Sequence, residues 1–289
     1  MKAALENPKC KEPEIKILKS AIDLYQEWTR REARIGTKGN DRVTDLVKLL
    51  NWYKDELEVE LIMKGGSDFL KRQKGQLKLD NSVLEEFLVS LVDPRIIEGL
   101  SNLDKLEIGP HEAFMSLAFI PKDLNELTSK PNVVVKTKDQ DFVIGKKIHY
   151  RFSTDSSFSA KSTTEGSTTL AVLAAESKVN LDKTMFQEAA GTAERLKQGC
   201  PMAKYFLLVE YLDMEPEDPR LTAIDNVYLL RHTRRLPFEK RSDVKEVSHQ
   251  HEKSPIDPKI VIRFVDQVRA FAGATWFDSG KVLEQGSFV

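Results

Sequence analysis

Two carboxylates and a lysine are the side chains of this sequence best suited to chemistry. Glu176-Ser177-Lys178 comes directly after residues 170–175, an uninterrupted apolar run that predicts a strand buried on both faces. Alternate residues of a strand point to the same face, so Glu176 and Lys178 project together and Ser177 points away. A carboxylate and an ammonium at the end of a buried strand are costly unless they bind a ligand or each other.

A second acidic segment, Asp139-Gln140-Asp141, opens an upstream strand expected over residues 141–144. If the two strands pair, an aspartate of the first reaches Glu176 on the second. Two carboxylates with a lysine form a site for a hard divalent cation with oxygen ligands. Such a cation stabilises charge that develops on a phosphate, while the lysine orients the attacking water or helps to deprotonate it. The pattern therefore favours metal-dependent hydrolysis of a phosphodiester, and its structural alternative is an ion pair at a strand end.

Apolar periodicity predicts the elements that position these residues. Helices are expected over residues 15–28, 46–61, from Asp80 or Ser82 to 91, 185–196 and 260–271. Strands are expected over residues 132–135, 141–144, 170–175, 205–212 and 227–230, and the Ser- and Thr-rich residues 153–169 are expected to form an exposed loop or hairpin tip. Strands alternating with helices after a helical start predict an α/β or α+β fold with a central mixed β-sheet.

Composition bounds the class of protein. Hydrophobic residues make up 40% of the 289 residues, which excludes an intrinsically disordered chain. A net charge of -1, from 44 Lys plus Arg and 45 Asp plus Glu, argues against indiscriminate binding to nucleic acid, because such proteins usually carry a basic excess. No secretory signal and no apolar run of about 18 residues is visible, so a cytoplasmic protein without a membrane partner is expected.

Two short basic segments are candidates for contacts with phosphate, because phosphate binding needs local rather than net positive charge. The first segment contains Lys71, Arg72, Lys74 and Lys78, and the second, which follows the strand expected at 227–230, contains Arg231, Arg234, Arg235, Lys240 and Arg241. Lys183, at the start of the helix after the Glu176-Ser177-Lys178 motif, is a further candidate. The alternative for each segment is an ordinary solvated loop.

Longer strings carry a resemblance to a known family. Asp141, Glu176 and Lys178 match the three positions of the PD-(D/E)xK nuclease fold. Four strings are similar to the restriction-endonuclease group that includes the two subunits of BbvCI, and they occupy residues 72–81, 138–142, 180–189 and 203–208. Uninterrupted strings of this kind are more specific than the short Glu-x-Lys motif, of which Glu14-Ile15-Lys16 is a chance example.

The resemblance implies a function and a division of the chain. It implies a Mg²⁺-dependent type II restriction endonuclease subunit of bacterial cytoplasm, acting on double-stranded DNA at asymmetric, CCTNAGC-like sites. In that group two related subunits each cut one strand, and the sequence leaves a homodimer and a heterodimer open. Residues 1–70 are then expected to form an N-terminal helical region, and residues 71–289 a nuclease core with DNA-recognition elements.

Residue roles follow from the same resemblance. Asp141 and Glu176 are expected to hold the metal with the backbone carbonyl of Ser177, and Lys178 to position the water. Gln140 stands where the family has proline, so Asp139 is an alternative ligand; Asp141 is preferred because the apolar strand begins directly after it. The fold often adds an acid from a preceding helix. Glu85, which flanks the apolar face of that helix, is the candidate here, and a solvated helix face is its alternative.

Two other functions stay open at this point. One is a structure-selective or repair nuclease of the same fold, and the other is a non-catalytic DNA-binding protein in which Glu176 and Lys178 form a structural pair. The sequence has no dinucleotide-binding or Walker A string. His249-Gln250-His251 is interpreted as part of a polar loop, since two histidines without a third ligand rarely bind metal.

Overall fold

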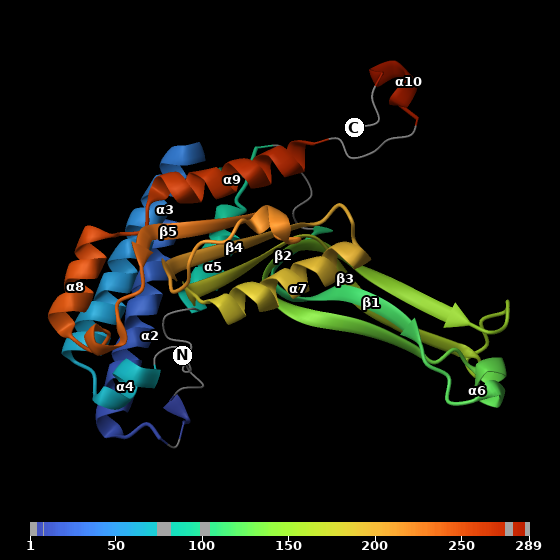
Figure 1. Cartoon of the computed structure of the whole chain (residues 1–289), viewed down its shortest axis with the longest axis horizontal. Helices are drawn as coiled ribbons and strands as arrows, with labels where there is room; N and C mark the ends of the chain where they lie inside the picture. Colours follow the sequence, from blue (N-terminus) through green and yellow to red (C-terminus); the bar gives the residue numbers. More distant parts are fainter. Residues whose placement is uncertain (1–4, 8, 74–81, 99–104, 275–279, 287–289) are drawn as a thin grey trace.

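A computed structural model describes residues 5–7, 9–73, 82–98, 105–274 and 280–286 of the chain. One five-stranded sheet, in the order β1-β2-β3-β4-β5, has helices on both faces (Figure 1). The strands are β1 (Glu107–Phe119), β2 (Val133–Ser153), β3 (Thr163–Leu181), β4 (Lys204–Leu212) and β5 (Asn226–Arg234). β1, β2 and β3 are antiparallel neighbours, whereas β4 and β5 continue parallel to β3. The predicted mixed sheet with flanking helices is therefore confirmed.

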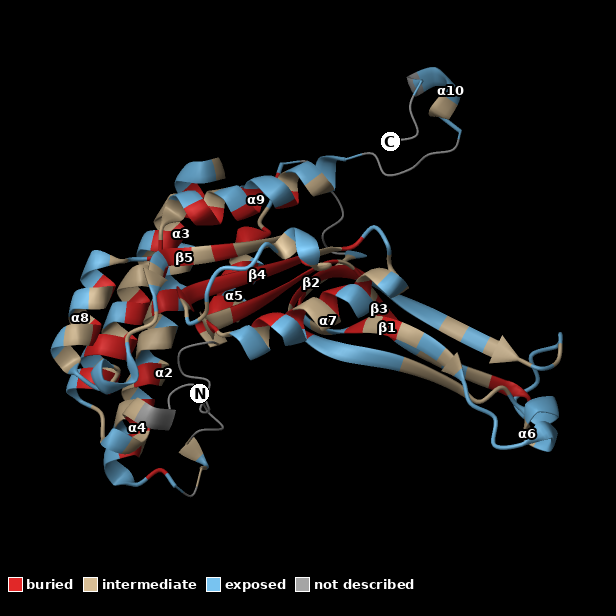
Figure 2. Ribbon diagram, in the orientation of Figure 1, coloured by how far each residue is buried: buried red, intermediate tan, exposed pale blue. Residues whose placement is uncertain are grey.

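The helices divide between the two faces of the sheet. α7 (Lys183–Gly199) covers one face and is N-capped by the Asp182 carboxylate, which accepts from the backbone N–H of Met185 at 2.8 Å. The larger core on the other face includes α2 (Glu12–Ala33), α3 (Gly39–Lys54), α5 (Ser82–Leu91) and α9 (Pro258–Gly273). Figure 2 shows that the buried residues concentrate in the strands and on the inner faces of these helices. Among the described residues, no helix is long and apolar enough to cross a membrane.

The remaining helical elements are short or irregular. They are the π-helix η1 (Asp55–Lys64), which continues α3, then α4 (Asp68–Gln73), α6 (Leu124–Ser129), the 3₁₀ turns η3 (Pro219–Leu221) and η4 (Phe238–Lys240), α8 (Val244–Lys253) and α10 (Val282–Gln285). The helix expected over residues 46–61 is thus an α-helix followed by a π-helix, and it ends at Gly65-Gly66 as the sequence predicts. A Cβ on Gly66 would lie 2.2 Å from the carbonyl oxygen of Ile62, so glycine is required at this close approach.

The N-terminal helices share a core with the sheet. Leu50 and Tyr53 of α3 belong to the same buried cluster as Phe206 of β4 and Phe264 of α9. Asn51 also makes two hydrogen bonds of 2.8 and 2.9 Å with the backbone of Ile256. The predicted boundary near residue 70 stays a prediction, and the apolar core contains residues from both sides of it.

Two expectations about strands are wrong. Residues 163–169 form the first part of β3, and only 154–162 form the tip that was expected over 153–169. Three threonines of this part, Thr163, Thr168 and Thr169, are buried, because β-branched side chains suit a pleated surface although they look polar in sequence. β1 was not predicted at all: Gly109 and Pro110 resemble a turn, yet they lie at a register shift within the strand.

β2 is sharply bent, and its two ends lie together. Its residues 133–145 pair with β1, and its residues 142–153 pair with β3, so the middle of the strand pairs with both neighbours. At the bend, a Cβ on Gly145 would lie 2.5 Å from the carbonyl oxygen of Leu170. At the far end, Thr154 Oγ1 donates to the carbonyl of Ser129 and Thr164 Oγ1 to that of Pro131, each at 2.7 Å. These segments form a projection, residues 111–140 and 146–170, that we call the β arm (Figure 1).

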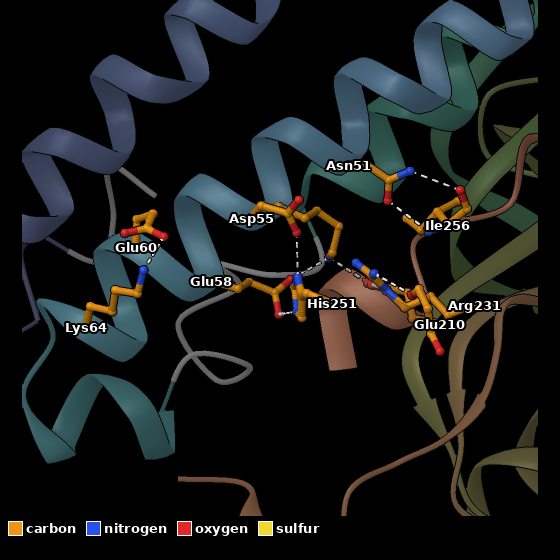
Figure 3. Close-up of polar contacts among 11 residues, drawn as sticks. Asn51, Asp55, Glu58, Glu60, Lys64, Glu210, Arg231, His251 and Ile256 are labelled. Carbon is orange, nitrogen blue, oxygen red and sulfur yellow. Dashed lines mark hydrogen bonds and ion pairs between the residues drawn. The ribbon is translucent and has the colours of Figure 1, made fainter. Parts of the chain in front are cut away.

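A buried ionic network joins α3, η1, β4, β5 and α8 (Figure 3), at the end of the core away from the β arm (Figure 1). Glu210 of β4 accepts from Arg231 of β5 at 2.8 Å and lies 2.5 Å from the Lys54 ammonium. Lys54 also contacts Glu58 of η1 at 2.8 Å, and His251 of α8 lies 2.8 Å from Asp55. His251 is therefore a buried helical residue, which corrects its interpretation as part of a polar loop.

Candidate active site

Pairing of β2 with β3 brings Asp141 next to the Glu176-Ser177-Lys178 motif. Phe142 pairs with Ala175, so the next residue of each strand, Asp141 and Glu176, are neighbours on one face. The Asp141 carboxylate accepts a hydrogen bond of 3.0 Å from the backbone N–H of Ser177. The expected meeting of an upstream aspartate with the β3 motif is therefore present in the structure.

Glu176 is the buried centre of the site, with only 8% of its surface exposed. Its Oε2 lies 3.2 Å from the Lys178 ammonium, and its Oε1 accepts a 2.5 Å hydrogen bond from the Tyr205 hydroxyl. Tyr205 is fully buried on β4, and burial together with the negative charge of Glu176 raises the pKa of its hydroxyl. The hydroxyl therefore keeps its proton and acts as a hydrogen-bond donor to Glu176.

Lys178 is cationic in this arrangement. Burial works to lower the pKa of its ammonium, but the adjacent carboxylates of Glu176 and Asp141 outweigh burial and raise that pKa. The site thus brings two acids and a lysine together: Lys178 contacts Glu176, and Asp141 bonds the backbone N–H of Ser177 between them. Both carboxylates lie on the face of the sheet that α7 covers, at the end of the apolar run 170–175.

Sequence reasoning missed three neighbours of Glu176. Besides Tyr205, they are Lys138, whose ammonium lies 4.0 Å from Glu176 Oε1, and Thr192 of α7, whose hydroxyl accepts a hydrogen bond from Lys138. Lys138 and Tyr205 both belong to family-like strings, 138–142 and 203–208, which were the available signal. Thr192 gave none, because it occupies a buried position on an apolar helix face.

The structure separates the two candidate aspartates. Asp139 is exposed, and among the described contacts it is the Asp141 carboxylate that reaches β3. Gln140 between them is buried, and the β1–β2 register shifts between the Gly109–Val143 and His111–Gln140 pairs. Asp141 is therefore the better-placed acid, as expected, while its role as a metal ligand stays a prediction.

The donor set fits a hard divalent cation with few protein ligands. In the described part of the chain, no group of three or more His, Cys, Asp or Glu side chains is suited to a metal. A small octahedral cation is usually held by one or two carboxylates, with waters and substrate phosphate completing its shell. Asp141 and Glu176 supply such a pair from adjacent strands.

Glu85 lies apart from this face. It is half-buried on α5, whose apolar residues Val83, Leu84 and Phe87 pack into the core on the other side of the sheet. Its neighbour Glu86 is exposed and accepts a hydrogen bond from the Tyr25 hydroxyl. The catalytic role expected for Glu85 stays a prediction.

The first basic segment is only partly described. Lys71 is half-buried in α4, and Arg72 belongs to the same short helix. Lys74 and Lys78 lie outside the described residues. The predicted phosphate contacts of these four residues stay predictions.

The second basic segment requires a correction. Arg231 does not follow the strand but lies within β5, is 1% exposed, and bonds Glu210 and the carbonyl of Ser254 (Figure 3). Its guanidinium is committed to the buried network and cannot reach a nucleic-acid backbone from this position. In the sequence, this arginine belongs to a basic cluster and could not be told from its exposed neighbours.

The other basic candidates lie at the surface and already contact acids. Arg234 Nη2 lies 2.9 Å from each carboxylate oxygen of Glu215, and Arg235 Nη1 lies 2.9 Å from Asp213 Oδ2. Lys183, the first residue of α7, lies 3.5 Å from Glu217. These three acids belong to the segment after β4, so the segment partly neutralises the basic surface. DNA contacts of Arg234, Arg235 and Lys183 stay predictions.

A mixed sheet carrying paired carboxylates and a lysine on adjacent strands defines a nuclease-like class of fold. A solved structure described as the native BbvCI A2B2 tetramer at low resolution shares this fold, with a TM-score of 0.58 and 17% sequence identity over 95% of this chain and 96% of that chain. The Bpu10I restriction endonuclease family model matches residues 76–288. The chain belongs to this family, and it is a type II restriction endonuclease, a hydrolase. No curated protein matches the sequence.

Proposed function

We propose that this chain is a Mg²⁺-dependent subunit of a type II restriction endonuclease that hydrolyses phosphodiester bonds of double-stranded DNA at a specific short sequence. The observation that carries the proposal is the contact between Asp141, on β2, and the Glu176-Ser177-Lys178 segment of β3. Family membership supports the reaction class, and the geometry supplies residues for it.

The two carboxylates are proposed to hold the metal ion, with the Ser177 backbone carbonyl as a further ligand. When bound, Mg²⁺ would neutralise charge on the scissile phosphate and favour a nucleophilic water. Asp141 is aligned for this by the backbone N–H of Ser177, and Glu176 by the hydroxyl of Tyr205. Such outer contacts orient metal ligands before the metal arrives.

Lys178 is proposed to position the attacking water. Its ammonium lies 3.2 Å from Glu176 Oε2, so it stands beside the carboxylate that would hold the metal. An ammonium donates hydrogen bonds and accepts none, so it orients a water through the oxygen of that water. In-line attack on phosphate depends mainly on this kind of positioning and on charge stabilisation.

Substitution of Lys178 by alanine tests the site. The Lys178→Ala variant should bind cognate DNA nearly as the native protein does and should lose detectable cleavage, because the lost group acts on the reacting water. Binding is measured by gel shift with Ca²⁺, and cleavage on a cognate plasmid with Mg²⁺. Cleavage at the native rate would show that the site is elsewhere.

The same assays separate the two alternative functions. A structure-selective or repair nuclease would cut branched or damaged DNA and show no preference for a short sequence. A non-catalytic DNA-binding protein would show no Mg²⁺-dependent nicking of plasmid DNA. Only cleavage at one sequence agrees with the proposal.

A related subunit is the proposed partner besides DNA. The BbvCI structure is described as an A2B2 tetramer, which contains two kinds of subunit. We propose that the present chain likewise acts as a dimer, with a second copy or with a related chain, and that each subunit cuts one strand. Light scattering of the chain alone and of the chain coexpressed with a related subunit distinguishes the two assemblies.

A further inference from the structure

Two lysines lie on opposite sides of the Glu176 carboxylate. Lys178, two residues further along β3, lies 3.2 Å from Oε2, whereas Lys138 reaches Oε1 from β2 at 4.0 Å. The family motif accounts for Lys178 alone. Lys138 therefore places a second positive charge in the site for which the motif assigns no function.

Lys138 is not needed to satisfy Glu176. The Tyr205 hydroxyl already donates to Oε1 at 2.5 Å, and Lys178 contacts Oε2. At 4.0 Å the Lys138 ammonium is within ion-pair range but beyond hydrogen-bond range. Pairing with Glu176 therefore does not by itself account for the position of Lys138.

The position of the Lys138 ammonium is fixed by α7. It donates to Thr192 Oγ1, and the Thr192 hydroxyl in turn donates to the carbonyl of Glu188 at 2.9 Å. Thr192 is fully buried, so this acceptor is immobile. An ammonium has three donors, and the Lys138 side chain is 42% exposed, so donor capacity remains on the solvent side.

We propose that Lys138 is a second phosphate-binding residue of the active site, which contacts a non-bridging oxygen of the scissile phosphate or of the phosphate next to it. The inference rests on the proposed function, because it requires DNA in this site. Lys178 would act on the water and Lys138 on the phosphate, with Glu176 between them. A fixed cation at this place stabilises the charge of the transition state without having to reorganise.

The Lys138→Met variant tests the proposal, since methionine keeps an unbranched chain and removes the charge. Single-turnover cleavage of cognate DNA should slow by about 10²- to 10³-fold, the usual effect of losing one such donor. The slope of log binding constant against log salt concentration, measured with Ca²⁺, should fall by about 0.9, the value for one phosphate contact. A purely structural role for Lys138 would leave this slope unchanged.

Lys136→Met is the matched control. Lys136 is an exposed lysine two residues earlier on the same strand, and no contact with Glu176 is recorded for it. This variant should retain the native cleavage rate within about twofold, because an exposed side chain that does not contact the site carries only a screened, long-range charge effect. Equal losses in Lys136→Met and Lys138→Met would indicate diffuse charge along the strand and would overturn the proposal.

Lys138→Arg adds a rescue, because arginine keeps the charge and also binds phosphate. It should restore the salt slope of binding and cleave faster than Lys138→Met. Unchanged cleavage by Lys138→Met, while Lys178→Ala is inactive, would refute the role of Lys138 and leave the proposed function intact. Failure of the native protein, tested both alone and with a related subunit, to cut any DNA would instead refute the proposed function.

Discussion

The carboxylate of Glu176 is held directly by Lys178 and Tyr205, with Lys138 at a longer distance. Lys178 is on its own strand, Tyr205 is on β4, and Lys138 is on β2. A buried carboxylate needs such partners, because an unpaired charge away from water is strongly unfavourable. These partners also fix the direction in which its oxygens point. Tyr205 is thus a positioning residue for Glu176.

Removal of the Tyr205 hydroxyl should weaken metal binding. In Tyr205→Phe, Glu176 loses its buried donor, so we expect the Mg²⁺ concentration for half-maximal cleavage to rise about 10- to 100-fold, as for other outer-shell contacts. The free energy of unfolding should fall by about 1–3 kcal/mol, since the bond involves a charged acceptor. Mg²⁺ titration of cleavage and chemical denaturation measure the two effects.

Tyr228→Phe is the control for this prediction. Tyr228 is also buried, but it packs on the opposite face of the sheet beside Phe206 and Phe264. Its hydroxyl is remote from the Asp141–Glu176 pair, so the Mg²⁺ requirement should not change. A native Mg²⁺ requirement in Tyr205→Phe would mean that Glu176 is aligned without the hydroxyl.

Among the residues of the site, those that belong to a sequence motif could be predicted. Those that reach the site only through the tertiary fold could not. Asp141, Glu176 and Lys178 could be predicted because they lie in an acidic segment and directly after the apolar run 170–175. Tyr205 lies in a family-like string, but its role could not be inferred, because its hydroxyl meets Glu176 only through the parallel pairing of β3 with β4. Arg231 shows the converse, since its charge suggested a surface contact and its burial was invisible.

At the scale of elements, the buried ionic network holds α3, η1, β4, β5 and α8 together. Lys54 and Arg231 both contact Glu210, and all three side chains are fully buried. A buried pair is costly to break, because removal of one partner leaves an uncompensated charge out of water. The π-helix η1 starts directly after Lys54, and Glu58, four residues further on, lies 2.8 Å from the Lys54 ammonium.

Glu210→Gln should therefore destabilise the protein by about 3–5 kcal/mol, the range for broken buried ion pairs. Denaturant unfolding measures this loss. Glu60→Gln is the control, since the Glu60–Lys64 pair of 2.6 Å lies on the exposed side of the same π-helix (Figure 3). A surface pair of this kind contributes less than about 1 kcal/mol. Equal effects of the two substitutions would argue that the network carries no special stability.

Most elements follow from apolar periodicity, and the exceptions have physical causes. The helices α2, α7 and α9 and the strands β4 and β5 have strong one-face or continuous apolar patterns. β1 and the first part of β3 lie on the β arm, where only one face is partly covered and polar residues are frequent. Their strand conformation comes from pairing with β2, which no local pattern reports.

At the scale of the whole molecule, the proposal that each subunit cuts one strand can be tested with mixed dimers. A mixed dimer of a Lys178→Ala chain with an active related subunit should cut one strand only, because the inactive site cannot act on its own strand. The measurement is conversion of supercoiled cognate plasmid to nicked circles. Linear product from such a dimer would falsify the assignment of one strand to each subunit.

The near-zero net charge of the whole chain does not describe how charge is distributed over its surface. Acidic residues after β4 contact Arg234, Arg235 and Lys183, while Lys138 and Lys178 lie beside the two carboxylates of the site. Positive charge is thus paired with negative charge at the described parts of both surfaces. The near-zero total agrees with weak non-specific binding to nucleic acid rather than with its exclusion.

The pairing of β2 with two strands limits where the length of this region can change. β2 pairs with β1 over residues 133–145 and with β3 over residues 142–153, so a residue inserted into or deleted from these paired stretches would turn the side chains beyond it to the opposite face. Residues 120–132 and 154–162, at the far end of the arm, lie outside these paired stretches. An insertion there would change the reach of the arm and leave the pairing that aligns Asp141 with Glu176 as it is.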